Sequence, residues 1–256
     1  MVTYLLKKSY QHKTLKEINF NDLWGDNGVF TTMWIFGKPA KILFFKKHIK
    51  NLINSLKVYK LNKPNIEKNI LKLIKLNIDK KKSYNHLFRI AINDKMISIS
   101  LRKRLTTKLR FNLKLINYKR NNPEFKNLKY KFILKNLSKM NNSCSDIGLC
   151  YNKKILESGT SNILFIKNNK IYSPKNNVYK GVNYNFFKKK LNSIISKDIK
   201  INSLSTYDEI LLIGSGKGVA SVQTINDTEW KRKSLKFYNK LFNLYKKEIS
   251  NCLLYR

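Results

Sequence analysis

The sequence predicts an α+β protein of two domains, and three observations support this class. The chain has 256 residues, 42% of them hydrophobic, which is enough for one large core or two modest ones. Segments with strand alternation occur together with segments of helical periodicity. Near residue 120, the stretch "RNNPEFK" combines two asparagines with a proline and is typical of a linker.

The first part of the chain predicts a small antiparallel α+β domain over residues 1–120. The run "GVFTTMWIFGKPAKILFF" alternates strand-forming residues around the turn signal "GKP" and predicts a hairpin over 28–45. Two amphipathic helices follow, in "HIKNLINSLKVYKL" and "NIEKNILKLIKLN". Three further runs alternate as strands: "HLFRIAIN", "MISISLR" and "RFNLKLINY".

Residues 121–126 form the predicted linker, and residues 127–256 form a larger second domain. Helical periodicity occurs in "NLKYKFILKNLSKM", "GVNYNFFKKKLNSII" and the closing "KSLKFYNKLFNLYKKEI". Strands are expected in "DIGLCYN", "NILFIKN", "EILLIGS" and "GVASVQTI".

The charge of the chain is strongly positive, with a formal net charge of +38 and an isoelectric point near 10.1. Only seven of the 53 basic residues are arginines, although arginine is the residue that best recognises bases and phosphates in two-point contacts. The lysines are spread from end to end among many asparagines and isoleucines. This distribution favours a solvated basic surface, so we expect no specific nucleic-acid partner.

Cysteine and histidine patterns exclude two further classes. The three cysteines have no metal-binding spacing and predict neither a disulfide framework nor a zinc site. His12 and His86 lack a metal-binding partner, and His48 lies beside the apolar face of its helix. The N-terminal apolar run is too short for a signal peptide, and no run is long enough to span a membrane. We therefore expect a cytoplasmic protein without a bound metal.

The stretch "EILLIGSGKGVASV", residues 209–222, predicts an anion site. A strand that ends in glycines leaves backbone N–H groups that can converge on a phosphate. Ser215 adds a hydroxyl and Lys217 an ammonium group. Glycines at this place also simply turn the chain, and the P-loop spacing is absent.

A longer motif links this loop to a known family. The segment "ILESGTSNILFIKNNKIYSPKNNVYKGVNYNFF" resembles the class IV aminotransferases, pyridoxal-phosphate (PLP) enzymes that include branched-chain and D-amino-acid aminotransferases and 4-amino-4-deoxychorismate lyase. Glu157, the small residues 158–161, Asn162, "YSP" and Gly181 follow the order of the family motif. "GDNGVFTTMWIFGKP" resembles the family's Gly-Asp-Gly hairpin, with Asn27 inserted, and "TYDEILLIGSGKGVASV" resembles its last block.

This resemblance implies a D-amino-acid-aminotransferase-like fold (PLP fold type IV). A small N-terminal α/β domain would precede a larger, β-barrel-like C-terminal domain with flanking helices. It also implies PLP as cofactor, small amino acids and keto acids as substrates, and a homodimer.

The resemblance assigns roles to individual residues. Lys126 is the catalytic lysine that holds the cofactor aldehyde as a Schiff base, and Asp146 occupies the acidic position that opens the next strand. Residues expected to bind the cofactor are Glu157 at the pyridine nitrogen, the backbone N–H groups of Val182 and Asn183, Ser215, Gly216 and Lys217 at the phosphate, and Tyr130 at the phenolic oxygen. A packing role for Tyr130 is equally compatible with its position.

Two positions depart from the family pattern. The family's phosphate-binding arginine falls on Asn51. The arginine that commonly follows the family's helix start, "GVN" at Gly181 in this sequence, falls on Tyr184. Loss of a bidentate cation weakens phosphate binding unless another charge replaces it. Lys217 or Lys180 would compensate; otherwise the protein binds PLP poorly or is a catalytically silent family member.

The resemblance leaves the reaction open between two branches. We expect an aminotransferase acting on a small, branched-chain or other amino acid, with 4-amino-4-deoxychorismate lyase, which releases pyruvate and 4-aminobenzoate, as the alternative. The doublet Thr31–Thr32 resembles the lyase, because aminotransferases more often carry a glutamate after the aromatic residue. These threonines point to opposite faces of a strand. Arg89, Arg110 and Arg120 are candidates for orienting a substrate carboxylate.

Overall fold

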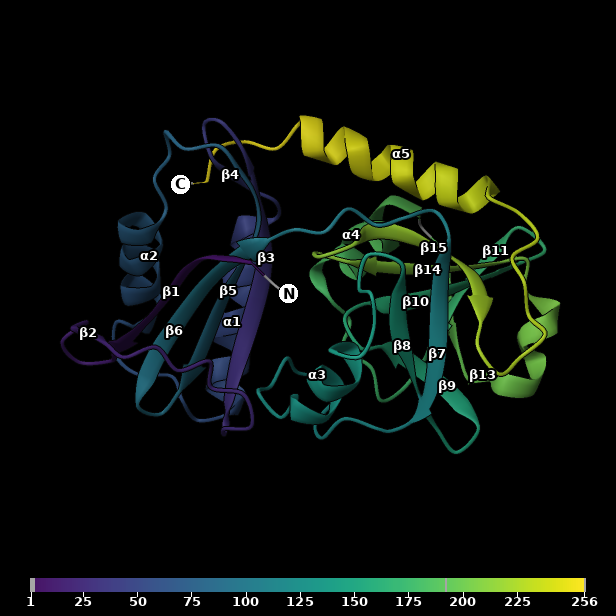
Figure 1. The fold of residues 1–256 in the computed structure, drawn as a ribbon, viewed down its shortest axis with the longest axis horizontal. Coiled ribbons are helices and arrows are strands. Elements are labelled where there is room, and N and C mark those ends of the chain that lie inside the picture. Colours follow the sequence, from purple (N-terminus) through teal and green to yellow (C-terminus); the bar gives the residue numbers. More distant parts are fainter. Residues whose placement is uncertain (1–2, 192, 256) are drawn as a thin grey trace. The chain divides into compact units, whose positions relative to one another are not determined.

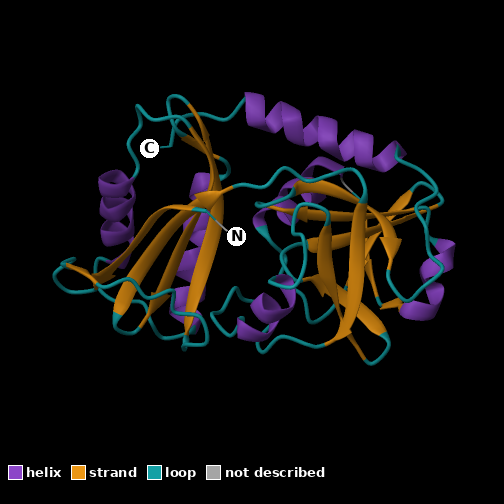
Figure 2. Cartoon of the chain, viewed as in Figure 1, coloured by secondary structure: helices purple, strands orange, loops and turns teal. Residues whose placement is uncertain are grey.

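The computed structural model describes residues 3–191 and 193–255, which form two compact units. The described part of the first unit contains residues 3–104, 125–131 and 251–255, and that of the second contains 105–124, 132–191 and 193–250. Figures 1 and 2 show the helices and strands of each. Each unit has its own core and is described separately below.

The first unit is an antiparallel sheet with two helices on one face. Its strands pair in the order β2-β1-β6-β5-β3-β4. Their bounds are β1 (Tyr4–Gln11), β2 (Glu17–Ile18), β3 (Gly28–Gly37), β4 (Lys41–Ile42), β5 (Tyr84–Asn93) and β6 (Met96–Lys103). The predicted hairpin at "GKP" corresponds to β3 and β4, and the two amphipathic helices correspond to α1 (Phe45–Val58) and α2 (Ile66–Asn77).

The two faces of this sheet differ in character. Val29, Met33 and Phe88 belong to the face whose side chains form one core with buried residues of α1 and α2, including Leu52 and Ile70. The opposite face carries a row of directly paired Thr32, Arg89 and Ser100, and a row of Phe30, Ala91, Ser98 and Ser9. Because strand side chains alternate between faces, the apolar core lies on one face of the sheet and the buried Arg89, Ser98 and Ser100 lie on the other.

The second unit is built on a nine-stranded mixed sheet in the order β12-β11-β10-β14-β15-β7-β8-β9-β13. The strands are β7 (Phe111–Asn117), β8 (Ser145–Tyr151), β9 (Lys154–Ser158), β10 (Asn162–Lys167), β11 (Lys170–Pro174), β12 (Ile194–Lys197), β13 (Ile199–Lys200), β14 (Glu209–Gly214) and β15 (Gly218–Ile225). The helices are α3 (Lys131–Leu137), α4 (Val182–Leu191), the 3-10 helix η1 (Ile201–Thr206) and α5 (Lys236–Ser250).

The mixed α/β architecture is confirmed, with two refinements. The strand order has free ends at β12 and β13, so the sheet does not close into a barrel in the described part of the chain. The units also divide differently from the expected 1–120, 121–126 and 127–256. Strand β7 pairs in parallel with β8 and β15, which places it in the second unit, whereas residues 125–131 belong to the first.

Two predicted helices are shorter than expected. α3 begins only at Lys131, so Lys126 and Tyr130 precede it and do not lie one helical turn apart. The helix expected through Ile195 ends as α4 at Leu191, and β12 pairs in parallel with β11 beyond it.

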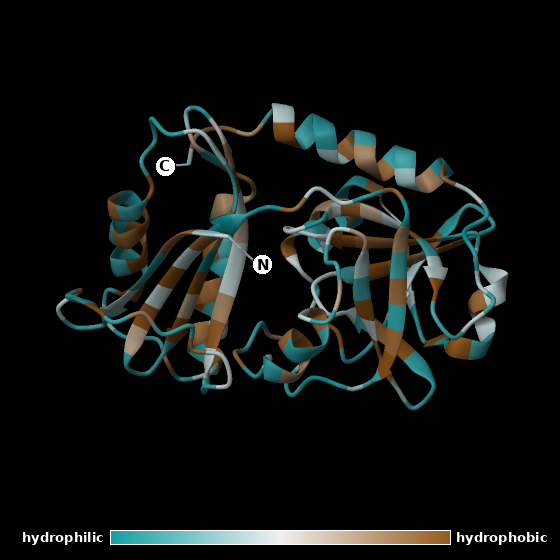
Figure 3. Cartoon of the chain, in the orientation of Figure 1, coloured by the Kyte–Doolittle hydropathy of each residue, from teal (hydrophilic) through white to brown (hydrophobic). Residues whose placement is uncertain are grey.

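The buried carboxyl group of Glu209 holds the first turn of helix α5. Glu209 is 1% exposed and accepts hydrogen bonds from the Phe237 and Tyr238 backbone N–H groups at 2.8 and 2.9 Å. These are N–H groups of the first helical turn, which have no partner within the helix. Hydrophobic and hydrophilic positions alternate along α5 (Figure 3), and Phe237, Leu241 and Tyr245 are its buried residues.

Candidate functional site

Lys126 lies in a short extended segment beside β3. The backbone N–H of Phe30 donates to the carbonyl of Lys126 at 2.9 Å, and that of Leu128 donates to the carbonyl of Gly28 at 2.9 Å. A Cβ at Gly28 would overlap both the Ile92 carbonyl and the Leu128 side chain, so only glycine permits this approach. The Lys126 Nζ lies 4.9 Å from the centroid of the Phe30 ring.

Three aromatic rings form a wall next to this lysine. Phe30 meets Trp24 at a centroid distance of 4.9 Å and Tyr130 at 5.4 Å, both edge to face. Trp24 and Tyr130 stack at 5.8 Å. Tyr130 therefore has the packing role that its position allowed, and its role at a cofactor stays a prediction.

Arg89 extends the polar face beyond this wall. Its guanidinium lies 4.1 Å from the centroid of the Trp24 ring, and Nη2 donates to the Asp22 carbonyl at 2.7 Å. The side chain is 9% exposed, its Nη1 is buried and has no hydrogen-bond partner among the described residues, and burial lowers its pKa to about 10. Such a desolvated guanidinium is costly unless it meets an anion. Arg89 is thus the best placed of the three carboxylate-binding candidates.

Thr31 faces the core side of β3, where its Oγ1 lies 2.9 Å from Nδ1 of His48 on α1. Thr32 shares the opposite face with Phe30 and Arg89, as expected from strand alternation. Burial, followed by the charge of Lys126, lowers the pKa of His48 to about 3. The imidazole is therefore neutral in the folded protein at physiological pH.

The neutral His48 predicts acid sensitivity of the fold. Because the folded pKa lies below the ordinary value of 6.5, the unfolded chain binds a proton first, and stability is lost as pH falls from 6.5 toward 3. The loss attributable to His48 is about 1.4 kcal/mol per pH unit, or about 2 kcal/mol between pH 6.5 and 5. Urea unfolding should show this slope in the unaltered protein and a shallower one in His48→Gln. An equal slope in the variant would contradict the assignment.

In the second unit, Glu157 on β9 is held by a buried ion pair. Arg120 Nε donates to Glu157 Oε1 at 2.6 Å, and Arg120 Nη2 donates to the Pro123 carbonyl at 2.6 Å. The two side chains are 1% and 7% exposed. The Tyr179 backbone N–H donates to Glu157 Oε2 at 3.2 Å. Arg120 thus holds Glu157, and the substrate-orienting role considered for it from the sequence does not fit this partner.

Asn162, the first residue of β10, is hydrogen-bonded to the segment that precedes α4. Its Oδ1 accepts from the Gly181 N–H at 3.0 Å, and its Nδ2 donates to the Tyr179 carbonyl. Helix α4 begins at Val182, and the N–H groups of its first turn have no helical partners. Asn183 is 2% exposed, and within residues 3–191 and 193–255 neither its buried Nδ2 nor its buried Oδ1 has a hydrogen-bond partner. An unsatisfied amide at a helix N-terminus is suited to an anion.

The glycine loop is a three-residue turn, 215–217, closed by the pairing of Gly214 with Gly218. A Cβ at Gly214 would lie 2.8 Å from Ser161 Oγ, so the turn packs directly on the run 158–161. Lys217 Nζ lies 2.9 Å from Asp146 Oδ2 and 2.6 Å from Thr160 Oγ1. Its ammonium therefore has a carboxylate partner.

The predicted site residues fall into two groups. Lys126 and Tyr130 belong to the first unit. The run 157–162 of the second unit contains Glu157 and contacts both the loop before α4 and the turn with Ser215 and Gly216. Tyr184 is buried in α4 and its hydroxyl lies 3.0 Å from Ser173 Oγ. Sequence reasoning missed the roles of Arg120 and Asp146 as partners of charged residues, for which the separate motifs gave no signal.

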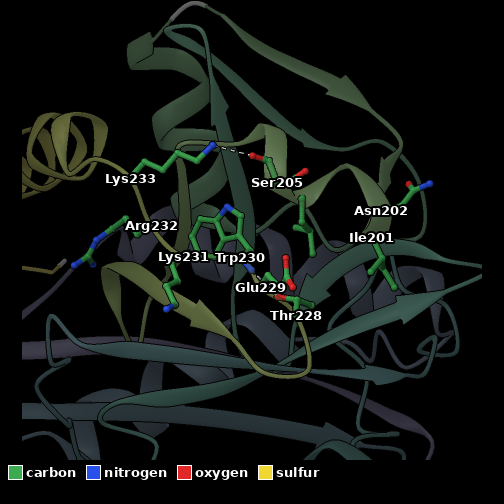
Figure 4. A pocket seen from close by; sticks show the side chains of 10 residues that line it. Ile201, Asn202, Ser205, Thr228, Glu229, Trp230, Lys231, Arg232 and Lys233 are labelled. Atoms are coloured by element: carbon green, nitrogen blue, oxygen red, sulfur yellow. Dashed lines mark hydrogen bonds between the residues drawn. The ribbon is translucent and has the colours of Figure 1, made fainter.

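A separate cavity lies elsewhere in the second unit. It has a volume of about 550 Å³ and is bordered by η1 and by residues 228–233, with Trp230 and Glu229 in its wall (Figure 4). Lys233 Nζ donates to the Ser205 carbonyl at its rim at 2.8 Å. This cavity contains none of the predicted site residues. In the described ranges, no helix is long and apolar enough to cross a membrane.

Comparison with known proteins gives a family match for most of the chain. Residues 28–225 match the family described as amino-transferase class IV, which is well over half of the chain. No curated protein sequence matches.

Solved structures share the fold at low identity. A protein assigned as a 4-amino-4-deoxychorismate lyase from Legionella pneumophila has a TM-score of 0.73 at 15% identity, covering 87% of this chain and 91% of its own. The branched-chain amino acid aminotransferase of T.th., complexed with N-(5'-phosphopyridoxyl)-L-glutamate, has a TM-score of 0.75 at 14% identity, covering 97% and 96%. A branched-chain aminotransferase from Thermoproteus uzoniensis, with norvaline, has a TM-score of 0.74 at 14%, covering 94% and 93%.

Proposed function

Because the chain belongs to the class IV aminotransferase family, we propose that it is a PLP-dependent enzyme in which Lys126 is the catalytic lysine. The observation that carries the proposal is the unsatisfied amide of Asn183 at the start of α4, next to a glycine turn. Both features suit a phosphate, and both lie at the positions that the family motif assigns to one. The residues present therefore fit this cofactor.

The phosphate would be held by the second unit. The backbone N–H groups of Val182 and Asn183 would donate to it at the helix N-terminus, together with the Asn183 amide. Ser215 would add a hydroxyl and Gly216 a backbone N–H. Lys180 is exposed beside Gly181 and is the cation available to offset the missing arginine at Asn51.

Glu157 would keep the cofactor's pyridine nitrogen protonated. Arg120 places a positive charge 2.6 Å from its carboxylate, and a carboxylate so placed carries a negative charge. Arg120 also fixes the direction of the carboxylate, since the Tyr179 N–H holds its second oxygen. A charged, fixed carboxylate is what a protonated ring nitrogen needs as a partner.

The chemistry at the substrate would be proton transfer by Lys126. When bound, PLP supplies an electron sink that acidifies the carbon bearing the substrate's amino group. Lys126 Nζ would accept that proton and return it at another atom, while the aromatic wall of Phe30, Trp24 and Tyr130 excludes water. Arg89, with its unpartnered Nη1, would bind a substrate carboxylate.

The environment of Thr31 favours one of the two reactions expected from the sequence. Aminotransferases of the family more often carry a glutamate at this position, whereas Thr31 here is 5% exposed and bonds the neutral His48. A glutamate would bury a negative charge beside that imidazole, which costs free energy without a cation. We therefore place 4-amino-4-deoxychorismate lyase first and transamination of a small amino acid second, the latter supported by the family description.

Product analysis tests this assignment. With aminodeoxychorismate, the lyase reaction should release pyruvate and 4-aminobenzoate in equal amounts while the cofactor stays an aldehyde. With amino acids alone, an aminotransferase would release a 2-oxo acid and leave pyridoxamine 5'-phosphate. Absence of both product sets in PLP-loaded protein would contradict an enzymatic function.

We also propose that the enzyme works in the cytoplasm and as a homodimer. The three cysteines are free in the structure, which suits a reducing compartment such as the cytoplasm. A homodimer is implied by the family resemblance.

A further inference from the structure

Asp146 is a fully buried carboxylate that gathers several donors. It is 0% exposed and lies at the start of β8. Its Oδ1 accepts from the Ile147 N–H at 2.8 Å, and its Oδ2 accepts from Ser158 Oγ at 2.9 Å and from Thr160 Oγ1 at 2.8 Å. These donors are neutral, and among the described residues the cation paired with this carboxylate is Lys217, whose Nζ lies 2.9 Å from Oδ2.

Lys217, which pairs with Asp146, is the last residue of the glycine turn. It directly follows Ser215 and Gly216, the two residues proposed to donate to the phosphate. Its side chain is 10% exposed and contacts both Asp146 Oδ2 and Thr160 Oγ1. Its backbone is held as well, because Thr107 Oγ1 donates to the Lys217 carbonyl at 3.3 Å.

A hairpin turn that is rich in glycine, as this one is with Gly214, Gly216 and Gly218, has a backbone with much conformational freedom. Here one end is packed on Ser161 through Gly214, and the other end is fixed by a buried ion pair. The same run also holds Gly181, since Asn162 accepts from its N–H. Both sets of proposed phosphate donors are therefore anchored to residues 160–162.

We propose that the Lys217–Asp146 ion pair is a positioning clamp for the anion-binding turn. Lys217 acts through the turn and not as the phosphate's main cation, because its charge is matched by Asp146. The pair does two things: it orders the donors of Ser215 and Gly216 before the anion arrives, and it neutralises a buried carboxylate that would otherwise repel a phosphate. This inference rests on the proposed function, since it concerns the same phosphate site.

The clamp also accounts for how this chain tolerates Asn51. The family resemblance places a phosphate-binding arginine there, and its loss removes a bidentate contact. A turn that is already ordered loses less conformational entropy on binding, so part of the missing affinity is recovered without a second direct cation.

The test compares PLP with pyridoxal, which lacks the phosphate. The unaltered protein should bind PLP more tightly than pyridoxal, as measured by absorbance titration. Lys217→Met should weaken PLP binding by about tenfold or more, a common effect of replacing a residue that orients a direct ligand contact. It should change pyridoxal binding by less than about twofold. Lys217→Met combined with Asp146→Asn, which removes the uncompensated charge, should recover part of the loss. Lys170→Met, at the exposed first residue of β11, makes the same change in net charge and should leave both affinities unchanged.

A second measurement does not depend on the covalent step. Inorganic phosphate should raise the thermal midpoint of the unaltered protein and of Lys170→Met, and raise it less in Lys217→Met. If Lys217→Met does not fold, Lys217→Gln keeps a polar head near Thr160 while removing the charge, and the same comparison is made with it.

The outcomes separate the clamp from the function. An unchanged PLP-to-pyridoxal ratio, or equal loss of both ligands, in a folded Lys217 variant would overturn the clamp and leave the proposed function intact. If the unaltered protein does not favour PLP over pyridoxal, the phosphate site itself is wrong, and the proposed function falls together with the clamp.

Discussion

Replacing Lys126 with alanine is expected to lower turnover by about two to four orders of magnitude, the usual contribution of a positioned proton-transfer group. No other amine is proposed to carry the proton, so the loss should appear in kcat, and added PLP should not restore it. The rate of product release, measured with the substrate identified by product analysis, reports this loss.

Lys129→Ala is the matched control for this prediction. Lys129 lies three residues away in the same segment, is exposed, and donates to the Gly25 carbonyl at 2.7 Å. Its replacement should leave turnover within about twofold. Equal losses in the two variants would mean that Lys126 acts through the fold of residues 125–131 and not at the reacting atoms.

Replacing Arg120 with methionine is expected to lower the free energy of unfolding by about 3–5 kcal/mol, because the buried Glu157 carboxylate would lose the cation that lies 2.6 Å from its Oε1. Denaturant unfolding at pH 7 measures this loss. Adding Glu157→Gln to Arg120→Met removes the stranded charge and should recover a substantial part of the stability. Exposed Arg110, replaced by methionine, should change stability by no more than about 0.5 kcal/mol.

The Arg120 variants also bear on the cofactor. A double variant that is stable but lacks the carboxylate should still bind PLP, because the phosphate donors lie on α4 and the glycine turn. It should be a poor catalyst, because the ring nitrogen has lost its charged partner. Stability of Arg120→Met equal to that of Arg110→Met would contradict the account of the ion pair.

Much of the fold is predictable because its elements have clear local patterns. Helices α1, α2 and α5 show apolar residues at helical spacing, and β5 and β6 show strand alternation. The first two residues of β12, Ile194 and Ile195, were wrongly predicted as the end of a helix, because two isoleucines suit either structure. Its pairing with β11 decides between them, and long-range pairing is not encoded locally.

The candidate site divides in the same way. Glu157, Asn183 and the glycine turn could be found because each belongs to a contiguous motif. The Arg120–Glu157 pair spans 37 residues of sequence, and the Lys217–Asp146 pair joins a turn to a distant strand. Among 53 basic residues, no local signal marks Arg120 and Lys217 as residues that meet a buried carboxylate. Three-dimensional contacts were needed for both.

Covalent attachment of PLP to Lys126 is the central claim, and borohydride reduction followed by peptide mapping tests it most directly. The protein is incubated with PLP, reduced, digested and analysed by mass spectrometry. We predict one dominant phosphopyridoxyl-lysine, in the peptide that contains Lys126, and its disappearance in Lys126→Ala. A dominant adduct on another lysine, or adducts scattered over the many surface lysines with none enriched at Lys126, would contradict the account.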